Sequence, residues 1–100
     1  MSVKILLTWN IKANAEQEYY GFMVGSFLPW MNHKELALTD AWVTMYGNEP
    51  QIMVGVIMPD LKAARDLLNS EEWLNLRDQL LEYVEDYTCK IIHQKGAFQL

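Results

Sequence analysis

The stretch that most constrains the fold is an apolar hairpin pattern between Leu36 and Met58. Two runs rich in β-branched, aromatic and other apolar residues, 36–46 and 51–58, are separated by Gly-Asn-Glu-Pro at 47–50. A turn cluster between two such runs is typical of a β-hairpin with a longer loop. Pro50 has no amide hydrogen to donate, so it fits before the second strand rather than within it. The centre of the chain is therefore predicted to be two adjacent antiparallel strands.

A further strand is predicted near each end of the chain. Residues 3–9 read Val-Lys-Ile-Leu-Leu-Thr-Trp, which is an almost continuous apolar and β-branched run. Residues 84–94 alternate less cleanly and carry more charge, which favours a strand at the edge of a sheet. With the hairpin, these two runs make four strands.

Two helices are predicted between these strands. Asn14 and Gln17 form a capping-box pattern that begins a helix running to about Met31, where Pro29 bends or ends it. The exposed side of this helix lacks polar residues beyond its first turn, so we expect it to be covered on more than one side. After the hairpin, Asp60 caps a second helix, which Ser70 restarts after an interruption.

The order of elements is β-α-β-β-α-β, the split βαβ arrangement of ferredoxin-like α+β folds. It predicts a four-stranded antiparallel sheet with two helices on one face, in which the first and third strands are central. The third strand is apolar on both faces, because residues 52, 54, 56 and 58 alternate with Met53, Gly55 and Ile57. The helices cover one face only. We therefore expect the other face to pack against the sheet of a second copy.

Composition limits the classes of function. The 100 residues correspond to a single domain, 1–100, with a formal net charge of −5 and no basic stripe, which argues against nucleic acid as a partner. The N-terminus has no signal-peptide pattern, and no apolar run is long enough to span a bilayer, so a cytoplasmic protein without a membrane partner is expected. Cys89 is the only cysteine, and its place in a strand predicts a buried, unreactive thiol.

No metal or cofactor motif is present in the sequence. His33 and His93 lie sixty residues apart without ligand spacing around either, and the glycines follow no phosphate-loop or dinucleotide pattern. We therefore predict neither a metal site nor a cofactor.

The segment Asn-Ser-Glu-Glu-Trp-Leu-Asn-Leu-Arg-Asp at 69–78 resembles the "S-x-E-W" segment in the second helix of the dimeric α/β-barrel superfamily. Small monooxygenases of the antibiotic-biosynthesis type and NIPSNAP-like proteins belong to that superfamily. The resemblance implies sheets paired back to back in a homodimeric barrel and a ligand pocket between sheet and helices. Asn10 and Trp73 match positions used by its haem degraders, but residues 59–83 contain no histidine, so haem degradation is not implied.

Seven residues are candidates for a ligand pocket. Arg77 falls inside the apolar arc of the second helix, where a guanidinium needs a ligand or a carboxylate such as Asp40 or Glu85. The tryptophans supply apolar walls or simply belong to the core, and His33 is a possible acid–base group at a pocket mouth. The candidates are Trp9, Asn10, Trp30, His33, Trp42, Trp73 and Arg77.

Three classes of function stay open at this point. The first is a homodimer that binds a small apolar or aromatic molecule between sheet and helices. The second is a cofactor-independent monooxygenase or isomerase that uses Asn10, His33 and Arg77. The third is a structural or regulatory dimer whose interior is filled by its own side chains. The absence of a recognisable catalytic constellation favours the first.

Overall fold

The computed structural model describes residues 2–43 and 52–93, with residues 37–43 described as backbone only. Four strands form one sheet in the order β2-β3-β1-β4, and each neighbouring pair is antiparallel. The strands are β1 (Val3–Ile11), β2 (Ala37–Val43), β3 (Ile52–Met58) and β4 (Val84–His93). The helical segments are α1 (Glu16–Phe22), η1 (Met23–Phe27), α2 (Leu28–His33), α3 (Leu61–Leu68) and α4 (Glu71–Leu80). The predicted ferredoxin-like α+β class is confirmed, and the predicted turn at 47–50 lies outside the described residues.

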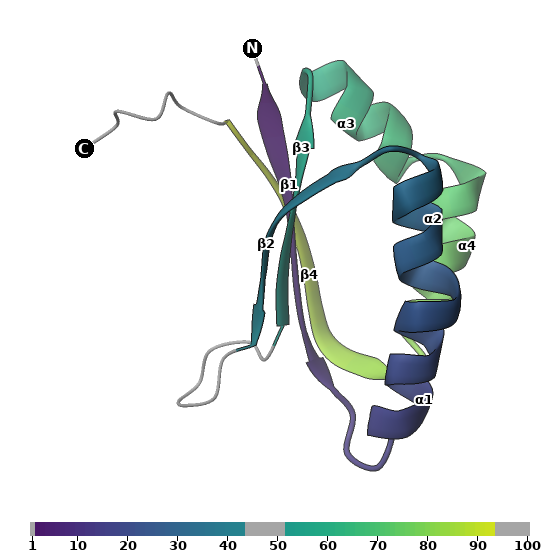
Figure 1. The fold of residues 1–100 in the computed structure, drawn as a ribbon. Helices are drawn as coiled ribbons and strands as arrows, with labels where there is room; N and C mark the ends of the chain where they lie inside the picture. Colours follow the sequence, from purple (N-terminus) through teal and green to yellow (C-terminus); the bar gives the residue numbers. More distant parts are fainter. Residues whose placement is uncertain (1, 44–51, 94–100) are drawn as a thin grey trace.

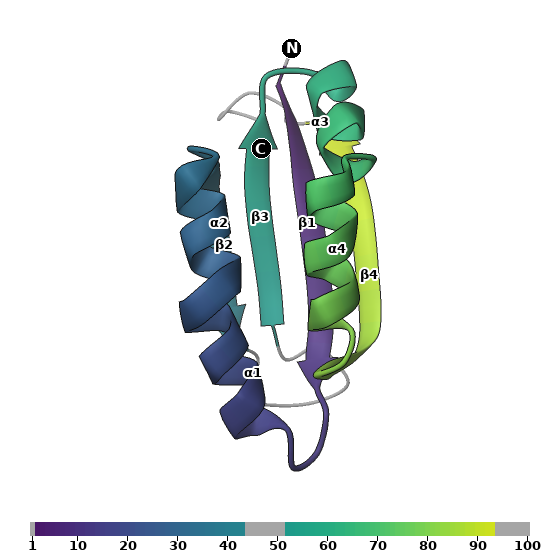
Figure 2. The same cartoon turned by 90° about the vertical axis from the view of Figure 1, so that its right-hand side faces the viewer.

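The described helices all lie on one side of the sheet (Figure 1). Seen from that side, α1 and α2 run along one flank, and α3 and α4 run along the other (Figure 2). No helix in the described part of the chain is long and apolar enough to cross a bilayer.

The core lies between the helices and the inner face of the sheet. Side chains alternate between the two faces of a strand, so every second residue of β1 and β3 points inward. The buried residues of these strands that follow this alternation are Val3, Ile5, Leu7, Trp9, Val54, Val56 and Met58. Phe27, Ala64 and Leu80 from the helices are fully buried against them.

The outer face of the sheet is mixed, with apolar residues beside Lys4, which lies opposite both Ile57 and Ile92, and Lys90, which lies opposite Leu6. Leu6 on β1 and Met53 and Ile57 on β3 are half-buried, and Ile92 on β4 is exposed. None of these four side chains belongs to the core or packs against it. The sheet therefore carries apolar residues on a face that the described helices do not cover.

The first helix is continuous from α1 through η1 to α2, ends close to the predicted Met31 at His33, and differs from the prediction at its start. Ala15 is its N-cap, whereas Asn14 has a φ of 67°, so the predicted cap at Asn14 is wrong. Asparagine tolerates the left-handed region found here, which is not a backbone conformation that N-cap residues normally adopt. Pro29 does not end the helix. In η1, the amide of Leu28 donates to the carbonyl of Met23, and this wide turn leaves room for the proline ring.

The second helical region begins as its sequence predicts. The Asp60 carboxylate accepts a hydrogen bond from the amide of Ala63 at 2.8 Å and caps α3. The Ser70 hydroxyl accepts from the amide of Trp73 at 3.3 Å and donates to the carbonyl of Leu67 at 2.7 Å. Ser70 thus ties the start of α4 to the end of α3.

Candidate functional site

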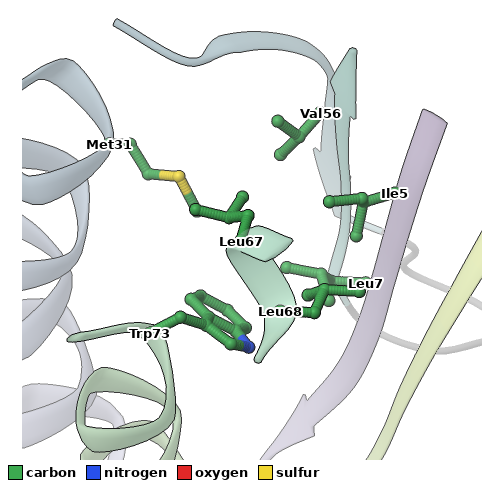
Figure 3. Close-up of a pocket in the computed structure, with 7 residues that line it drawn as sticks. All are labelled: Ile5, Leu7, Met31, Val56, Leu67, Leu68 and Trp73. Atoms are coloured by element: carbon green, nitrogen blue, oxygen red, sulfur yellow. The ribbon is translucent and has the colours of Figure 1, made fainter. Parts of the chain in front are cut away.

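A small cavity lies between the sheet and the helices (Figure 3). Its walls come from β1, β3, α2, α3 and α4, and all seven lining residues are apolar: Ile5, Leu7, Met31, Val56, Leu67, Leu68 and Trp73. The space open to the centre of a water-sized sphere is about 10 Å³, which is at the lower limit for one water molecule. The lining offers no polar group to hold a water molecule, so the space favours apolar contents.

The chemistry that this cavity offers is binding rather than proton transfer. None of its walls supplies an acid, a base or a charge. A molecule larger than water enters only if side chains move. Met31 and Leu67, which come from the helices, are the lining side chains that we expect to change conformation. Methionine is unbranched and flexible, so Met31 adapts most readily to a guest.

Among the predicted ligand residues whose side chains are described, Trp73 is the one that lines the cavity. Its buried ring lies 6.2 Å from the ring of Phe27 and 5.9 Å from that of Trp30, measured between centroids. Trp30 is half-buried beside it and contacts the cavity wall rather than the cavity itself. The two tryptophans therefore join α2 to α4 along one side of the space.

A polar cluster lies over this pair of tryptophans. The Glu72 carboxylate accepts a hydrogen bond from the Trp30 indole at 3.4 Å and pairs with the Lys34 ammonium at 3.0 Å. The lysine bond, and then the indole bond, lower the pKa of Glu72. These exposed contacts link the end of α2 to the start of α4 next to Met31 and Trp73.

Trp9 lies in the core rather than in a pocket. It is fully buried, and its indole nitrogen donates to the Tyr19 hydroxyl at 3.0 Å. Its ring packs edge-on against Phe27 and stacks on Tyr87 at 6.4 Å. Since its only hydrogen-bond donor is already used, Trp9 shapes the interior but has no polar group to offer a ligand.

Arg77 has a different partner from those predicted. Its guanidinium pairs at 3.0 Å with its chain neighbour Asp78, at a point where 35% of the arginine side chain is exposed. The Nε atom of Arg77 is buried, and no hydrogen-bond partner for it is found among the described residues. The predicted partner Glu85 is not the one used, and the Asp40 side chain lies outside the described part. Arg77 does not line the cavity.

Arg77 acts electrostatically on two side chains of β4. Burial raises the pKa of the Tyr87 phenol, and the nearby Cys89 adds to this, while the Arg77 guanidinium opposes it. Partial burial raises the pKa of the Cys89 thiol, whereas the contact with Tyr87 and the charge of Arg77 lower it. Cys89 itself is exposed, so the prediction of a buried thiol is wrong. It faces inward, but β4 is an edge strand and leaves it open at the margin of the core.

The polar residues of the predicted catalytic set do not meet at the cavity. Asn10 donates to the Asp86 carboxylate at 3.0 Å, where the register between β1 and β4 shifts. His33 is exposed at the end of α2. Neither residue lines the cavity, and the side chain of Trp42 lies outside the described residues. Within residues 2–43 and 52–93, no group of three His, Cys, Asp or Glu residues is placed to hold a metal ion.

The sequence interpretation missed most of the true cavity wall. Leu67 and Leu68 have the periodicity of an inward-facing helix side, and this signal is visible in the sequence. Met31 gives no such signal, because its position depends on the wide turn of η1 that precedes it.

No protein-family model matches the chain, and no curated protein matches its sequence. Solved structures do match. A NIPSNAP family protein from Agrobacterium tumefaciens is 15% identical, with a TM-score of 0.72 over 96% of this chain and 88% of the other. A dimeric protein of unknown function with a ferredoxin-like fold, from Bacteroides fragilis, is 12% identical, with a TM-score of 0.66 over 93% and 96%.

A third similar structure belongs to an enzyme. SnoaB, a cofactor-independent oxygenase from Streptomyces nogalater, solved as the mutant N63A, is 8% identical, with a TM-score of 0.67 over 99% of this chain and 98% of the other. The predicted resemblance is thus confirmed: the chain shares the ferredoxin-like fold of NIPSNAP family proteins and of a cofactor-independent oxygenase.

Proposed function

We propose that this protein is a homodimer that binds a small, neutral, apolar molecule between its sheet and its helices. The observation that carries the proposal is the cavity at that place, whose seven walls are all apolar. A charged ligand would lose its hydration there without gaining a partner, so the cavity favours hydrocarbon-like or aromatic guests.

Binding requires the cavity to expand. About 10 Å³ holds no organic molecule, so Met31, Leu67 or Leu68 must change rotamer when a ligand enters. The packing between the helices allows these rotamer changes, because α2 meets α4 mainly through Trp30, Trp73 and the exposed Glu72 cluster.

The test uses benzene as the probe and thermal unfolding as the readout. A ligand that binds only the folded state raises the melting temperature, and the stabilisation grows with the logarithm of its concentration once this exceeds its dissociation constant. Benzene is expected to raise the melting temperature of the natural protein, and to raise it further in Leu67→Ala, whose cavity is larger. Leu74→Ala is the matched control, because Leu74 packs on the same core but does not line the cavity.

The outcomes separate two of the three open functions. Stabilisation of the natural protein and a larger effect in Leu67→Ala alone support a binding function. Stabilisation of Leu67→Ala without any effect on the natural protein means that the interior is filled by its own side chains. The proposal would then give way to a structural or regulatory dimer.

A cofactor-independent oxygenase or isomerase is the second candidate. The fold similarity to SnoaB supports it, over nearly the full length of both chains. Asn10, His33 and Arg77 do not line the cavity, so catalysis in this protein would rely on other groups. Oxygen uptake, measured with an oxygen electrode after a bound guest has been identified, tests this candidate directly.

The homodimer is supported by the outer face of the sheet. Leu6, Met53, Ile57 and Ile92 lie on the face opposite the helices, where Lys4 and Lys90 are interspersed among them, and one similar protein is described as dimeric. Packing two such faces together would give the paired sheets of an α/β barrel and remove this surface from water.

A further inference from the structure

The first helix has an exposed face with no polar side chain over its central part. Between Glu18 and Asn32, every exposed residue is aromatic, aliphatic, proline or glycine: Tyr20, Gly21, Val24, Gly25, Leu28 and Pro29. The exposed fractions are 56% for Tyr20, 71% for Val24 and 42% for Leu28. We call these six residues the helix stripe. Most exposed helix faces are polar, so a continuous apolar stripe marks an interaction surface.

The wide turn of η1 keeps the stripe straight. In a regular α-helix, residues four apart drift steadily around the axis, but the bond from the Leu28 amide to the Met23 carbonyl spans one residue more. This turn brings Leu28 back into line with Val24 and Tyr20. Gly21 and Gly25 lie alongside, and a Cβ built on either one meets no atom within 4 Å. The stripe is therefore open to the backbone of an approaching helix.

We propose that this stripe is a second self-association surface, which pairs antiparallel with the same helix of another copy. Val24 lies at the middle of the helix that runs from Glu16 to His33. In an antiparallel pair centred there, Val24 meets Val24 on the two-fold axis, and Tyr20 meets Leu28 of the second copy. The surface is self-complementary, as an isologous interface requires.

The charges at the helix ends favour the antiparallel direction. Glu16 and Glu18 lie in the first turn, whereas the other end carries both signs, with His33 and Lys34 followed by the exposed Glu35. Parallel pairing would place Glu16 and Glu18 beside their own copies, and antiparallel pairing places them toward Lys34 of the second copy instead. Lys34 already pairs with Glu72 but keeps 34% of its side chain exposed, so it can meet a second carboxylate. The same acidic end would be repelled by an anionic lipid surface.

A single pair of helices buries less surface than stable protein complexes require, which is above about 1,000 Å² in total. The helix pair is therefore a weak contact on its own. It gains strength when each copy is already held in a dimer through its sheet, because two stripes then act together. The expected result is an assembly of sheet dimers that grows with concentration.

Sedimentation velocity from low micromolar to near-millimolar concentration tests the proposal. The natural protein is expected to form a species larger than its smallest stable oligomer as concentration rises. Val24→Glu should abolish that species and leave the smaller oligomer intact, because two carboxylates would meet on the axis. Asn75→Glu, which adds the same charge at an exposed site on α4, should behave like the natural protein.

A loss of the smaller oligomer in Val24→Glu would assign the stripe to the primary dimer and overturn the proposal. So would identical sedimentation of Val24→Glu and the natural protein. Flotation with neutral phosphatidylcholine vesicles is the companion measurement. If the natural protein floats and Val24→Glu does not, the occupant is a lipid surface instead of a second copy.

Cysteine crosslinking tests the register, in a Cys89→Ser background. A disulfide needs Cα atoms within about 7 Å, and close packing over Gly21 and Gly25 brings residues on the axis near that range. Val24→Cys should crosslink to itself on mild oxidation. Tyr20→Cys should crosslink to Leu28→Cys in a mixture but not to itself, since two copies of residue 20 lie about 12 Å apart along the axis. Rapid self-crosslinking of Tyr20→Cys contradicts the antiparallel arrangement.

Discussion

Arg77 shows how little a charge inside an apolar pattern reveals about its partner. The helical wheel places it among leucines, but its guanidinium reaches out to the exposed carboxylate of Asp78. An exposed ion pair contributes about 1 kcal/mol or less. We expect Arg77→Met to change the free energy of unfolding by no more than that, because no buried carboxylate is left unpaired. Lys62→Met, which removes the exposed pair of Lys62 with Asp66, is the control.

Chemical denaturation of the two variants measures this difference. A loss of about 3 kcal/mol or more in Arg77→Met alone would mean that the arginine serves a buried ion pair, which the geometry does not support.

Tyr87 gives the protein a dependence on alkaline pH. Its folded-state pKa lies above the ordinary value of 10.0, first because of burial. The stabilisation from keeping the phenol neutral is complete below pH 10.0 and is lost as the pH rises from there toward the folded-state pKa. Tyr87→Phe removes the ionisation but keeps the ring that stacks on Trp9. The stability of the natural protein should therefore fall relative to that of Tyr87→Phe above pH 10. Parallel curves in urea at rising pH would show that Tyr87 is not responsible.

At the scale of the element, helix starts were predictable where they depend on a local hydrogen bond. Asp60 and Ser70 cap α3 and α4 as their side chains and spacing indicate. Asn14 was not predictable in the same way, because the turn after β1 forces it into the left-handed region. The wide turn of η1 was not predictable either. It places Phe27 in the core beside Trp9, and that packing is a property of the whole fold.

Ser70 offers a quantitative test at this scale. Its hydroxyl makes two hydrogen bonds that join α3 to α4, so Ser70→Ala should cost about 1 kcal/mol of unfolding free energy. Ser70→Asn retains an N-cap acceptor and should recover most of this loss. Equal losses in both variants would mean that the bond to the Leu67 carbonyl, rather than the cap, holds the junction.

At the scale of the whole molecule, the order of elements was enough to predict the fold. The candidate site could not be predicted in this way, because it depends on contacts between residues that are far apart in the sequence. The apolar runs 3–9 and 52–58 predicted the two central strands, because a strand buried on both faces has a nearly continuous apolar sequence. The cavity gathers residues from β1, β3, α2, α3 and α4, and of the predicted candidates with described side chains only Trp73 is there. Cys89 was misplaced because a strand pattern does not reveal which side chains an edge leaves open.

The proposed dimer is tested on the outer face of the sheet. Val54 and Val56 point into the core, so a charge at either would unfold the protein whatever its oligomeric state. Ile57 points to the other face, and Ile57→Lys should shift sedimentation from dimer to a destabilised monomer. Ile57→Val keeps the apolar surface and should remain dimeric. A folded dimer of Ile57→Lys would place the subunit contact elsewhere.

The pairing of β1 with β4 has a consequence for how the chain folds. Val3 lies opposite His93, so β1 finds one of its two neighbours in a strand that is synthesised much later. Contacts between residues so distant in sequence close slowly, because a long loop must be ordered before they form. Until β4 has been synthesised, β1 has an open edge and exposes apolar side chains, and such segments are prone to aggregate. Shortening the chain before residue 84 should therefore yield an insoluble product rather than a smaller domain.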